Sequence, residues 1–215
     1  MDVSGNYAEL GYLHVRQLIP PEVARAVVRM IKEGLGPEPL ELSTVTQHQQ
    51  QLKRPAFNIY GYDYWPMIFF LWGLTPTIST LTGHDLLPAY DYFRLYREGD
   101  VCRVHSDRAS CEHSVSLTLD YSDGEIWDLQ VARQGRPDAL PMSDDFGPDD
   151  YSSVGMNVGD AVLYRGVHHR HGRITPNPNA WSAHLFLHYV ERGGPFADHA
   201  FDKRMDLRAV NFSFC

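Results

Sequence analysis

Two histidines and an aspartate have the residue types and the spacing of a metal site. The sequence reads His105-Ser106-Asp107, and His171 stands far downstream. Residues two apart on an extended backbone project from the same face of a strand. An imidazole from a facing strand can then complete three ligands on one side of a metal ion, which leaves the opposite coordination positions open.

Such a facial set of two imidazoles and one carboxylate suits non-haem Fe(II), because a redox-active metal must hold a cosubstrate and O₂ at once. Zinc accepts similar ligands, so the spacing alone does not choose the metal. His168 and His169 lie close to His171 and could each replace it by spacing. The residues by themselves therefore predict a metal site at His105 and Asp107 and leave the third ligand open among three histidines.

The residues around these positions form two blocks that match one known family. The first block spans residues 94–108 and 110–114 and resembles the pattern RxYxxGxxLxxHxDR with a later CE.S. The second, about 65 residues further on, spans residues 159–166, 171–173 and 185–189. Together they resemble the Fe(II)- and 2-oxoglutarate-dependent dioxygenases of the prolyl-4-hydroxylase-like superfamily. The resemblance covers residues 81–190, with a weaker match over residues 11–22.

This resemblance implies a double-stranded β-helix (jelly-roll) core. It implies that His105, Asp107 and His171 bind iron, because the spacing within the distal block selects His171. It also implies an oxidoreductase that uses O₂ and 2-oxoglutarate, releases succinate and CO₂, and oxidises an unactivated C–H bond, usually as a hydroxylase.

The sequence departs from the family pattern at the cation that pairs the distal carboxylate of 2-oxoglutarate. Many members place an Arg or Lys about ten residues after the distal histidine, where this chain has Ala-Trp-Ser at residues 180–182. Arg173 is our first candidate, since it shares a strand face with His171 and a guanidinium can pair a carboxylate through two hydrogen bonds. Tyr96 can donate a hydrogen bond to that carboxylate, and Arg94, in phase with Tyr96, is the reserve cation. The plainer interpretations are an exposed strand residue for Arg173 and a core aromatic for Tyr96.

The remaining histidines carry no metal-ligand pattern. His184 and His188 lie four apart on a predicted strand, hence on one face, and we expect them to be packed or hydrogen-bonded. Four others read as ordinary surface or capping residues: His14, His48, His84 and His199.

The elements that position the candidate site change type along the chain. Helical spacing of apolar residues predicts helices over 20–32, 66–74 and 75–82, the last ended by Gly83, whereas residues 40–64 show no clear period. Short alternating segments then predict strands over 89–96, 113–119, 127–131, 161–164, 171–175 and 181–190. Residues 133–155, rich in Pro, Gly and Asp, are too long for a simple connection and suggest a lid.

We therefore expect an α+β fold in a single domain over residues 1–215. A mostly helical support layer covers 1–86, the jelly-roll core covers 87–190, and a C-terminal tail covers 191–215. A length of 215 residues is sufficient to bury a core of this size.

Composition limits the partners and the location. The net charge of −8 lacks the positive field that supplies affinity for nucleic acid. The longest apolar run, residues 67–74, is too short to span a bilayer, so we expect no membrane partner. Three cysteines without CxxC spacing suggest no disulfide framework and favour a cytoplasmic protein. The sequence makes no prediction of the oligomeric state.

Two classes of function fit these observations. The first is an Fe(II)/2-oxoglutarate oxygenase acting on a small molecule such as an amino acid or natural-product intermediate, or on a protein side chain. The second is a metal-binding cupin-like protein without oxygenase activity. The complete block from Arg94 to Arg108 favours the first, and the missing downstream cation is the one feature that favours the second.

Overall fold

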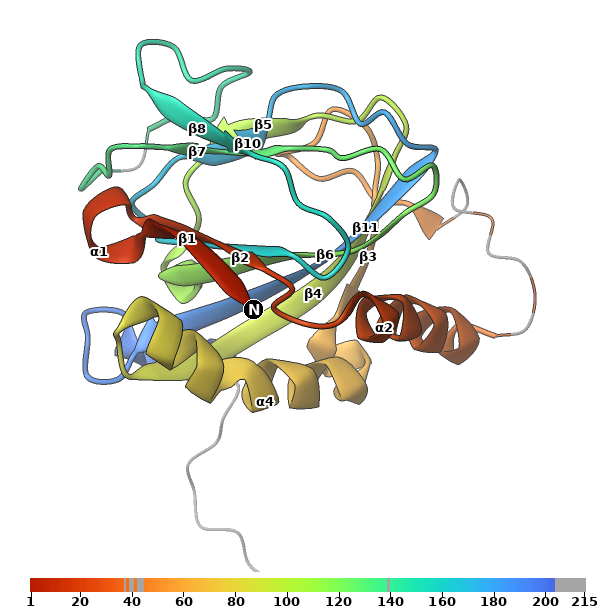
Figure 1. Ribbon diagram of the computed structural model, residues 1–215, viewed down its shortest axis with the longest axis horizontal. Helices are drawn as coiled ribbons and strands as arrows, with labels where there is room; N and C mark the ends of the chain where they lie inside the picture. Colours follow the sequence, from red (N-terminus) through yellow and green to blue (C-terminus); the bar gives the residue numbers. More distant parts are fainter. Residues whose placement is uncertain (37, 39–40, 42–44, 139, 204–215) are drawn as a thin grey trace, which may run out of the picture.

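Two antiparallel sheets lie one above the other in the computed structural model, which describes residues 1–36, 38, 41, 45–138 and 140–203 (Figure 1). The larger sheet has the strand order β1 (Asp2–Asn6), β2 (Tyr12–Arg16), β9 (Ala161–Tyr164), β6 (His113–Tyr121), β11 (Trp181–Glu191), β4 (Leu86–Arg97), β3 (Phe57–Tyr60). The smaller sheet has the order β5 (Cys102–His105), β10 (His171–Arg173), β7 (Leu129–Ala132), β8 (Tyr151–Val154).

Each face of the larger sheet is buried against a different layer. Along β11, Leu185 and Leu187 belong to the core that the sheet shares with the helices, whereas Phe186 packs with Tyr96 and Trp127 on the opposite face, toward the smaller sheet. This alternation follows from the two-residue period of a strand. Because β11 is covered on both faces, it reads as a nearly continuous apolar run.

Helices α2 (Pro21–Gly34) and α4 (Trp65–Thr82) cover the face of the larger sheet that points away from the smaller one (Figure 1). α2 begins with Pro21 in its first turn, as the sequence predicts, and buries Ala24 and Ile31, whereas Val23 and Met30 remain exposed. The short α1 (Tyr7–Leu10) links β1 to β2. Three 3₁₀ turns complete the described elements: η1 (Gly61–Asp63), η2 (Ala109–Cys111) and η3 (Ala197–Lys203).

The expected helices over 66–74 and 75–82 form the single helix α4. Pro76 lies inside it and removes one backbone donor, which is why the sequence suggested a break. The helix continues because Leu71 and Ile78, on either side of the proline, are both fully buried against the sheet. As predicted, α4 ends at Gly83, whose φ of 77° is the left-handed conformation that glycine adopts most easily.

The structure adds five strands to the six that alternation predicts. They are β1 and β2 near the N-terminus, β3 within the unassigned segment, β5 before the candidate ligand His105, and β8 at the end of the expected loop. Residues 1–86 therefore contribute three complete strands to the larger sheet as well as helices, so the expectation of a mostly helical layer there is too simple. The expected α+β class with antiparallel sheets is confirmed.

The segment over residues 133–150 is tied to the smaller sheet at several points. Val104 of β5 and Ser143 pair through both backbone groups, while the bond from Arg133 N to Asp150 O, at 2.9 Å, joins the two ends of the segment. Arg170, next to His171, donates to Asp149 Oδ2 at 3.0 Å. The described part of this segment is therefore anchored on the strand that carries a candidate ligand.

No helix among the described residues is long and apolar enough to cross a membrane. The expected C-terminal tail begins with Glu191 at the end of β11 and continues through η3; residues 204–215 lie outside the described residues.

Candidate functional site

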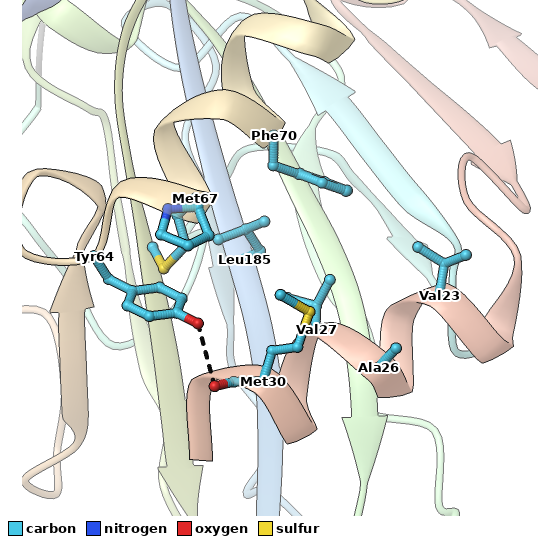
Figure 2. A pocket seen from close by; sticks show the side chains of 9 residues that line it. Val23, Ala26, Val27, Met30, Tyr64, Met67, Phe70 and Leu185 are labelled. Carbon is cyan, nitrogen blue, oxygen red and sulfur yellow. Dashed lines mark hydrogen bonds between the residues drawn. The ribbon is translucent and has the colours of Figure 1, made fainter. Parts of the chain in front are cut away.

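An apolar pocket of about 260 Å³ lies between α2 and α4 (Figure 2). Val27 and Met30 of α2 and Phe70 of α4 line it, and Leu185 of β11 forms part of its wall. Because Leu185 faces the helices, this pocket lies on the opposite face of the larger sheet from the smaller sheet. It contains none of the residues that the sequence singled out for chemistry.

His105, Asp107 and His171 come together between the two sheets. Their ligand atoms all lie within 4.8 Å of one another. Asp107 Oδ1 lies 3.6 Å from His105 Nε2 and 3.5 Å from His171 Nε2. The antiparallel pairing of β5 with β10 places His105 directly opposite His171, so the backbone register brings the two imidazoles together.

Backbone carbonyls fix the orientation of both imidazoles. His105 Nδ1 lies 2.7 Å from Arg103 O, and His171 Nδ1 lies 2.9 Å from His169 O. Carbonyl oxygens only accept hydrogen bonds, so each Nδ1 carries a proton and Nε2 is the nitrogen on the Asp107 side. Coordination of a metal through Nε2 requires this orientation of both rings.

Asp107 is held by groups on both sides of its carboxylate. Ser114 Oγ donates to Asp107 Oδ2 at 3.0 Å and lies 2.9 Å from His188 Nδ1. Asp107 N donates to Gly166 O at 2.8 Å. A Cβ at Gly166 would lie 2.4 Å from Asp107 Oδ2, so this close approach requires glycine. With Oδ2 engaged by Ser114, Oδ1 is the oxygen that faces the imidazoles.

Burial and mutual charge set the ionisation of the three groups. Burial, with His171 adding to the effect, lowers the pKa of His105 to about 4. Burial acts in the same direction on His171, but the Asp107 carboxylate outweighs it and raises the pKa of His171. Although burial favours the protonated acid, the two imidazoles lower the pKa of Asp107. At neutral pH the site therefore offers a carboxylate and a neutral His105, the states in which these groups bind metals.

The two neighbouring histidines that spacing left open point elsewhere. His169 Nδ1 lies 2.9 Å from Ala132 O, and its Nε2 lies where a Cβ at Gly11 would be. His168 Nδ1 lies 3.1 Å from Arg136 O. Neither belongs to a described group of possible metal ligands, whereas His171 does.

Arg94, Tyr96 and Arg173 also lie between the sheets, and all three are buried. Arg94 Nε donates to Asn58 Oδ1 at 2.6 Å, and Arg94 Nη1 lies 3.5 Å from the Tyr96 hydroxyl. Arg173 donates to Trp127 O and stacks on the Trp127 ring at 4.7 Å from its centroid. Arg173 is thus not the exposed strand residue of the plainer interpretation, while Tyr96 does pack as a core aromatic.

Both guanidinium groups lack an ion-pair partner among the described carboxylates, although Arg94 and Arg173 are only 3% and 1% exposed. A buried charge without a counter-charge is unfavourable unless an anion binds there. His184 Nδ1 lies 3.4 Å from Arg173 Nη2, and its Nε2 has no hydrogen-bond partner in the described structure. Burial and the two arginines hold the pKa of His184 far below its usual value, so its imidazole stays neutral.

Ser114 and His188 are functional candidates that sequence reasoning did not single out for a role at this site. His188 stacks on Tyr90 at 4.5 Å, and burial lowers its pKa to about 4. Its expected packed and hydrogen-bonded state is therefore observed, as it is for His184. Ser114 lies in the first sequence block, but its bond to Asp107 depends on the pairing of β6 with β11, which no local pattern reveals.

Comparisons with known proteins support the fold of the chain. No family model matches the sequence, and no curated protein matches it. Among solved structures, the α-ketoglutarate dependent carbocyclase SnoK from nogalamycin biosynthesis has a TM-score of 0.64 at 12% identity, over 86% of this chain and 81% of that one. HygX from Streptomyces hygroscopicus, with nickel, 2-oxoglutarate and hygromycin B bound, has a TM-score of 0.62 at 10% identity, over 86% and 84%. A Pseudomonas putida prolyl-4-hydroxylase has a TM-score of 0.52 at 16% identity, over 87% and 96%.

The chain therefore has the fold of non-haem, 2-oxoglutarate-dependent enzymes, and the resemblance expected from the two sequence blocks is confirmed at the level of the fold. The similar structures include a carbocyclase, an epimerase and a prolyl hydroxylase. One fold thus carries several reactions, and the reaction of this chain must be argued from its own residues.

Proposed function

We propose that this protein is an Fe(II)- and 2-oxoglutarate-dependent oxygenase that hydroxylates, or otherwise oxidises, an unactivated C–H bond of a small molecule. The observation that carries the proposal is that a possible metal site and a possible anion site lie together between the two sheets. A facial set of two imidazoles and a carboxylate lies between the same two sheets as two buried arginines that have no ion-pair partner among the described residues. A metal and a dicarboxylate are the ligands that these two groups fit.

His105, Asp107 and His171 are the proposed iron ligands. Two imidazoles and one carboxylate form the facial triad that non-haem Fe(II) oxygenases use. When bound, Fe(II) would supply the coupling of O₂ reduction to the oxidative decarboxylation of 2-oxoglutarate. The chain's own residues hold the ligands in place: two backbone carbonyls fix the imidazole tautomers, and Ser114 fixes the carboxylate.

Arg173, Tyr96 and Arg94 are the proposed 2-oxoglutarate-binding residues, with Arg173 pairing the distal carboxylate. Burial raises the pKa of Tyr96 to about 12, so its hydroxyl stays protonated and can donate a hydrogen bond. Arg94 lies beside that hydroxyl and adds a second positive charge. The cation that the sequence lacks after the distal histidine is thus replaced by residues on β10 and β4.

The proposed fold in finer detail is a double-stranded β-helix (jelly-roll) in a single domain over residues 1–215. The two facing antiparallel sheets support it, as does the core shared by Tyr96 and Phe186 of the larger sheet with Cys102 of the smaller one. We also propose a cytoplasmic location, which the unpaired, buried Cys102 and Cys111 favour.

A small-molecule substrate, such as an amino acid or a natural-product intermediate, is the substrate class we propose. HygX binds hygromycin B, and SnoN, an epimerase, has been solved with a nogalamycin compound. Both structures share the fold of this chain at low identity, which supports the class of substrate. A protein side chain is the alternative substrate, and it becomes the better proposal if no small molecule is turned over.

The test of the oxygenase assignment is cosubstrate turnover. Anaerobic addition of 2-oxoglutarate to the Fe(II) protein should give a visible charge-transfer band, and O₂ should then yield succinate, slowly even without substrate. His105→Ala and His171→Ala should lose both signals, since two ligands hold Fe(II) poorly. A wild-type protein that binds iron without either signal would instead be a cupin-like metal protein without oxygenase activity.

The test of the cosubstrate residues is the Arg173→Ala variant. Loss of one partner of a buried charge pair costs roughly 2–5 kcal/mol, so the KM for 2-oxoglutarate should rise on the order of a hundredfold. Iron affinity should change little, because Arg173 is not a proposed ligand. An unchanged KM would transfer the pairing role to Arg94, and Arg94→Ala is then the variant to measure.

A further inference from the structure

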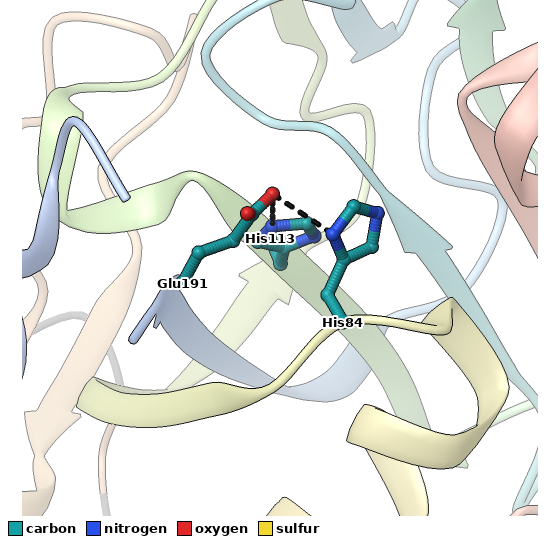
Figure 3. A group of neighbouring side chains, drawn as sticks. All are labelled: His84, His113 and Glu191. Atoms are coloured by element: carbon teal, nitrogen blue, oxygen red, sulfur yellow. Dashed lines mark hydrogen bonds and ion pairs between the residues drawn. The ribbon is translucent and has the colours of Figure 1, made fainter. Parts of the chain in front are cut away.

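A second group of possible metal ligands lies on the opposite face of the larger sheet. It consists of His84, His113 and Glu191, whose ligand atoms lie within 4.8 Å of one another (Figure 3). His84 Nδ1 lies 2.9 Å from Glu191 Oε1, and His113 Nε2 lies 3.3 Å from the same oxygen. The figure shows the carboxylate of Glu191 reaching toward both imidazoles.

The alternation of β6 separates this group from the first site. Ser114 contacts Asp107 and His188 between the sheets, so the preceding residue, His113, projects from the other face. On β11, His188 faces the interior, while Tyr189 bonds to Leu71 O of α4 and Glu191 lies in phase with it. The two groups of ligands are therefore on opposite faces of one sheet.

The backbone holds the three residues in position without any ion. His113 opposes Tyr189, and Glu191 opposes Leu86, in the register of the sheet. His84 follows Gly83, the residue that ends α4, and precedes β4. Arg192 N donates to Asp85 O at 2.8 Å, which closes the turn beside the group. Metal binding would require little rearrangement of the backbone.

The distances within the group fit a transition metal. Two ligands bound tetrahedrally to Zn²⁺ at about 2.1 Å lie about 3.4 Å apart. The N–O separations from Glu191 Oε1 to His84 Nδ1 and His113 Nε2, 2.9 and 3.3 Å, are close to this value. Zn²⁺ commonly binds imidazole nitrogens together with a carboxylate, whereas Mg²⁺ and Ca²⁺ prefer sites made of oxygen ligands alone.

Tyr7 orients the His113 ring so that one nitrogen faces Glu191. Its Nδ1 lies 2.7 Å from the Tyr7 hydroxyl, and the two rings stack at 5.8 Å. With Nδ1 engaged by Tyr7, Nε2 is the nitrogen directed at Glu191.

The local charge and exposure also favour a cation. Glu112 Oε2 accepts a hydrogen bond from Glu191 N at 2.8 Å, which places a second carboxyl group beside the first. The guanidinium of Arg165 lies 3.5 Å from His84 Nε2, the nitrogen that faces away from Glu191. The side chains of His84 and Glu191 are 27% and 34% exposed, so an ion can enter from solvent.

We propose that His84 Nδ1, His113 Nε2 and a carboxylate oxygen of Glu191 form a second metal site, which binds Zn²⁺. The ion clips the turn between α4 and β4 to the ends of β6 and β11. This site is independent of the proposed oxygenase centre, because no residue is shared between the two groups. Without an ion, the same atoms form a hydrogen-bonded triad in which Glu191 accepts from both imidazoles.

The experiment counts zinc ions bound by the full chain after metal removal and dialysis against Zn²⁺. The first site also accepts zinc, so the wild type should bind two ions. His84→Ala and Glu191→Gln should bind one, His105→Ala should bind one, and the His84→Ala/His105→Ala double variant should bind none. His48→Ala, a change at an exposed histidine outside both groups, is the matched control and should keep two.

Tyr7→Phe supplies a second measurement that keeps the ring and the fold. Loss of a hydrogen bond to a ligating imidazole weakens metal binding by about 10–100-fold, so the second ion should be released at correspondingly higher free zinc while the first is unaffected. One ion in the wild type that is lost in His105→Ala, or two ions retained in His84→Ala, would overturn the proposal and leave the hydrogen-bonded triad. One ion lost only in His84→Ala would support the second site while contradicting the oxygenase centre.

Discussion

Glycine at position 166 is a requirement of the candidate iron site at the scale of a single residue. A methyl group there would meet Asp107 Oδ2 at 2.4 Å and Cys111 O at 2.5 Å. We expect Gly166→Ala to displace the carboxylate and weaken Fe(II) binding by at least about tenfold, as changes around metal ligands do. Equilibrium dialysis with Fe(II) under anaerobic conditions measures the change.

Gly73→Ala is the control for that substitution. Gly73 lies in α4 with no atom within 4 Å of the added Cβ, so alanine there should leave iron affinity unchanged and favour the helix by up to about 1 kcal/mol. Equal iron affinity in Gly166→Ala and Gly73→Ala would show that the position of the Asp107 carboxylate does not matter for metal binding.

Asp91 is a buried carboxyl group whose two oxygens both lack a hydrogen-bond partner among the described residues. Burial raises its pKa to about 7. The folded protein therefore holds this proton more tightly than the unfolded chain, whose carboxyl titrates near 3.8. The tighter binding of this proton stabilises the folded state fully below the unfolded pKa of 3.8. As pH rises from there to about 7, the free energy of unfolding falls by about 1.4 kcal/mol per pH unit.

We expect Asp91→Asn to remove this pH dependence, because an amide does not ionise. Urea unfolding at pH 5 and pH 8 should show the variant gaining stability relative to the wild type as pH rises. Asp85→Asn, at a carboxylate whose side chain is 71% exposed, should show no such gain. A constant difference between Asp91→Asn and the wild type at both values would mean that Asp91 is not protonated in the folded state.

At the scale of elements, the segment over residues 133–150 depends on one buried ion pair. Arg170, 6% exposed, pairs with Asp149, which also pairs with Arg136. Asp149→Ala would leave Arg170 buried without this partner, so we expect a loss of about 3 kcal/mol in the free energy of unfolding and faster proteolysis within the segment. Asp138→Ala, at an exposed residue of the same segment, should change neither. Unchanged urea unfolding in Asp149→Ala would show that Arg170 does not need its carboxylate.

The sequence predicts the elements that carry their own pattern and misses those that depend on distant partners. β6, β9 and β11 alternate or form apolar runs, and all three lie where expected. β1 is exposed at all five positions and gives no alternation; it exists because β2 pairs with it and β2 in turn pairs with β9. β3 and β8 have four residues each, like β9, but each buries only one of them, so neither forms the apolar run that marks β9.

The candidate sites follow the same division. His105 and Asp107 are two residues apart in sequence and come with a recognisable block, so the first site could be predicted. His84, His113 and Glu191 span more than a hundred residues and lie in one turn and two strands, and the sequence indicated only an ordinary surface residue at His84. Their proximity depends on the register of β6, β11 and β4, which a single sequence does not reveal.

At the scale of the whole molecule, 2-oxoglutarate should link the two sheets. Arg94 lies in the larger sheet, whereas Arg173 and two of the proposed iron ligands lie in the smaller one. A ligand that binds only the folded state stabilises it by about 2.7 kcal/mol at a hundred times its Kd. We expect this gain in thermal unfolding of the anaerobic Fe(II) protein, and a much smaller one in Arg173→Ala at the same 2-oxoglutarate concentration. An equal gain in both proteins would argue against the proposed cosubstrate site.

The successive residues His113 and Ser114 of β6 make contacts on opposite faces of the larger sheet, and these contacts depend on the register of the strand. A slip of this strand by one position against β9 and β11 would turn every side chain to the opposite face. His113 would then leave Tyr7 and Glu191, and Ser114 would leave Asp107 and His188, so a misregistered chain would lose contacts at both groups of polar side chains at once. Only one register of β6 allows His113 and Ser114 to make their contacts at both groups. A chain that binds a ligand at both sites is therefore one in which β6, β9 and β11 have paired in the correct register.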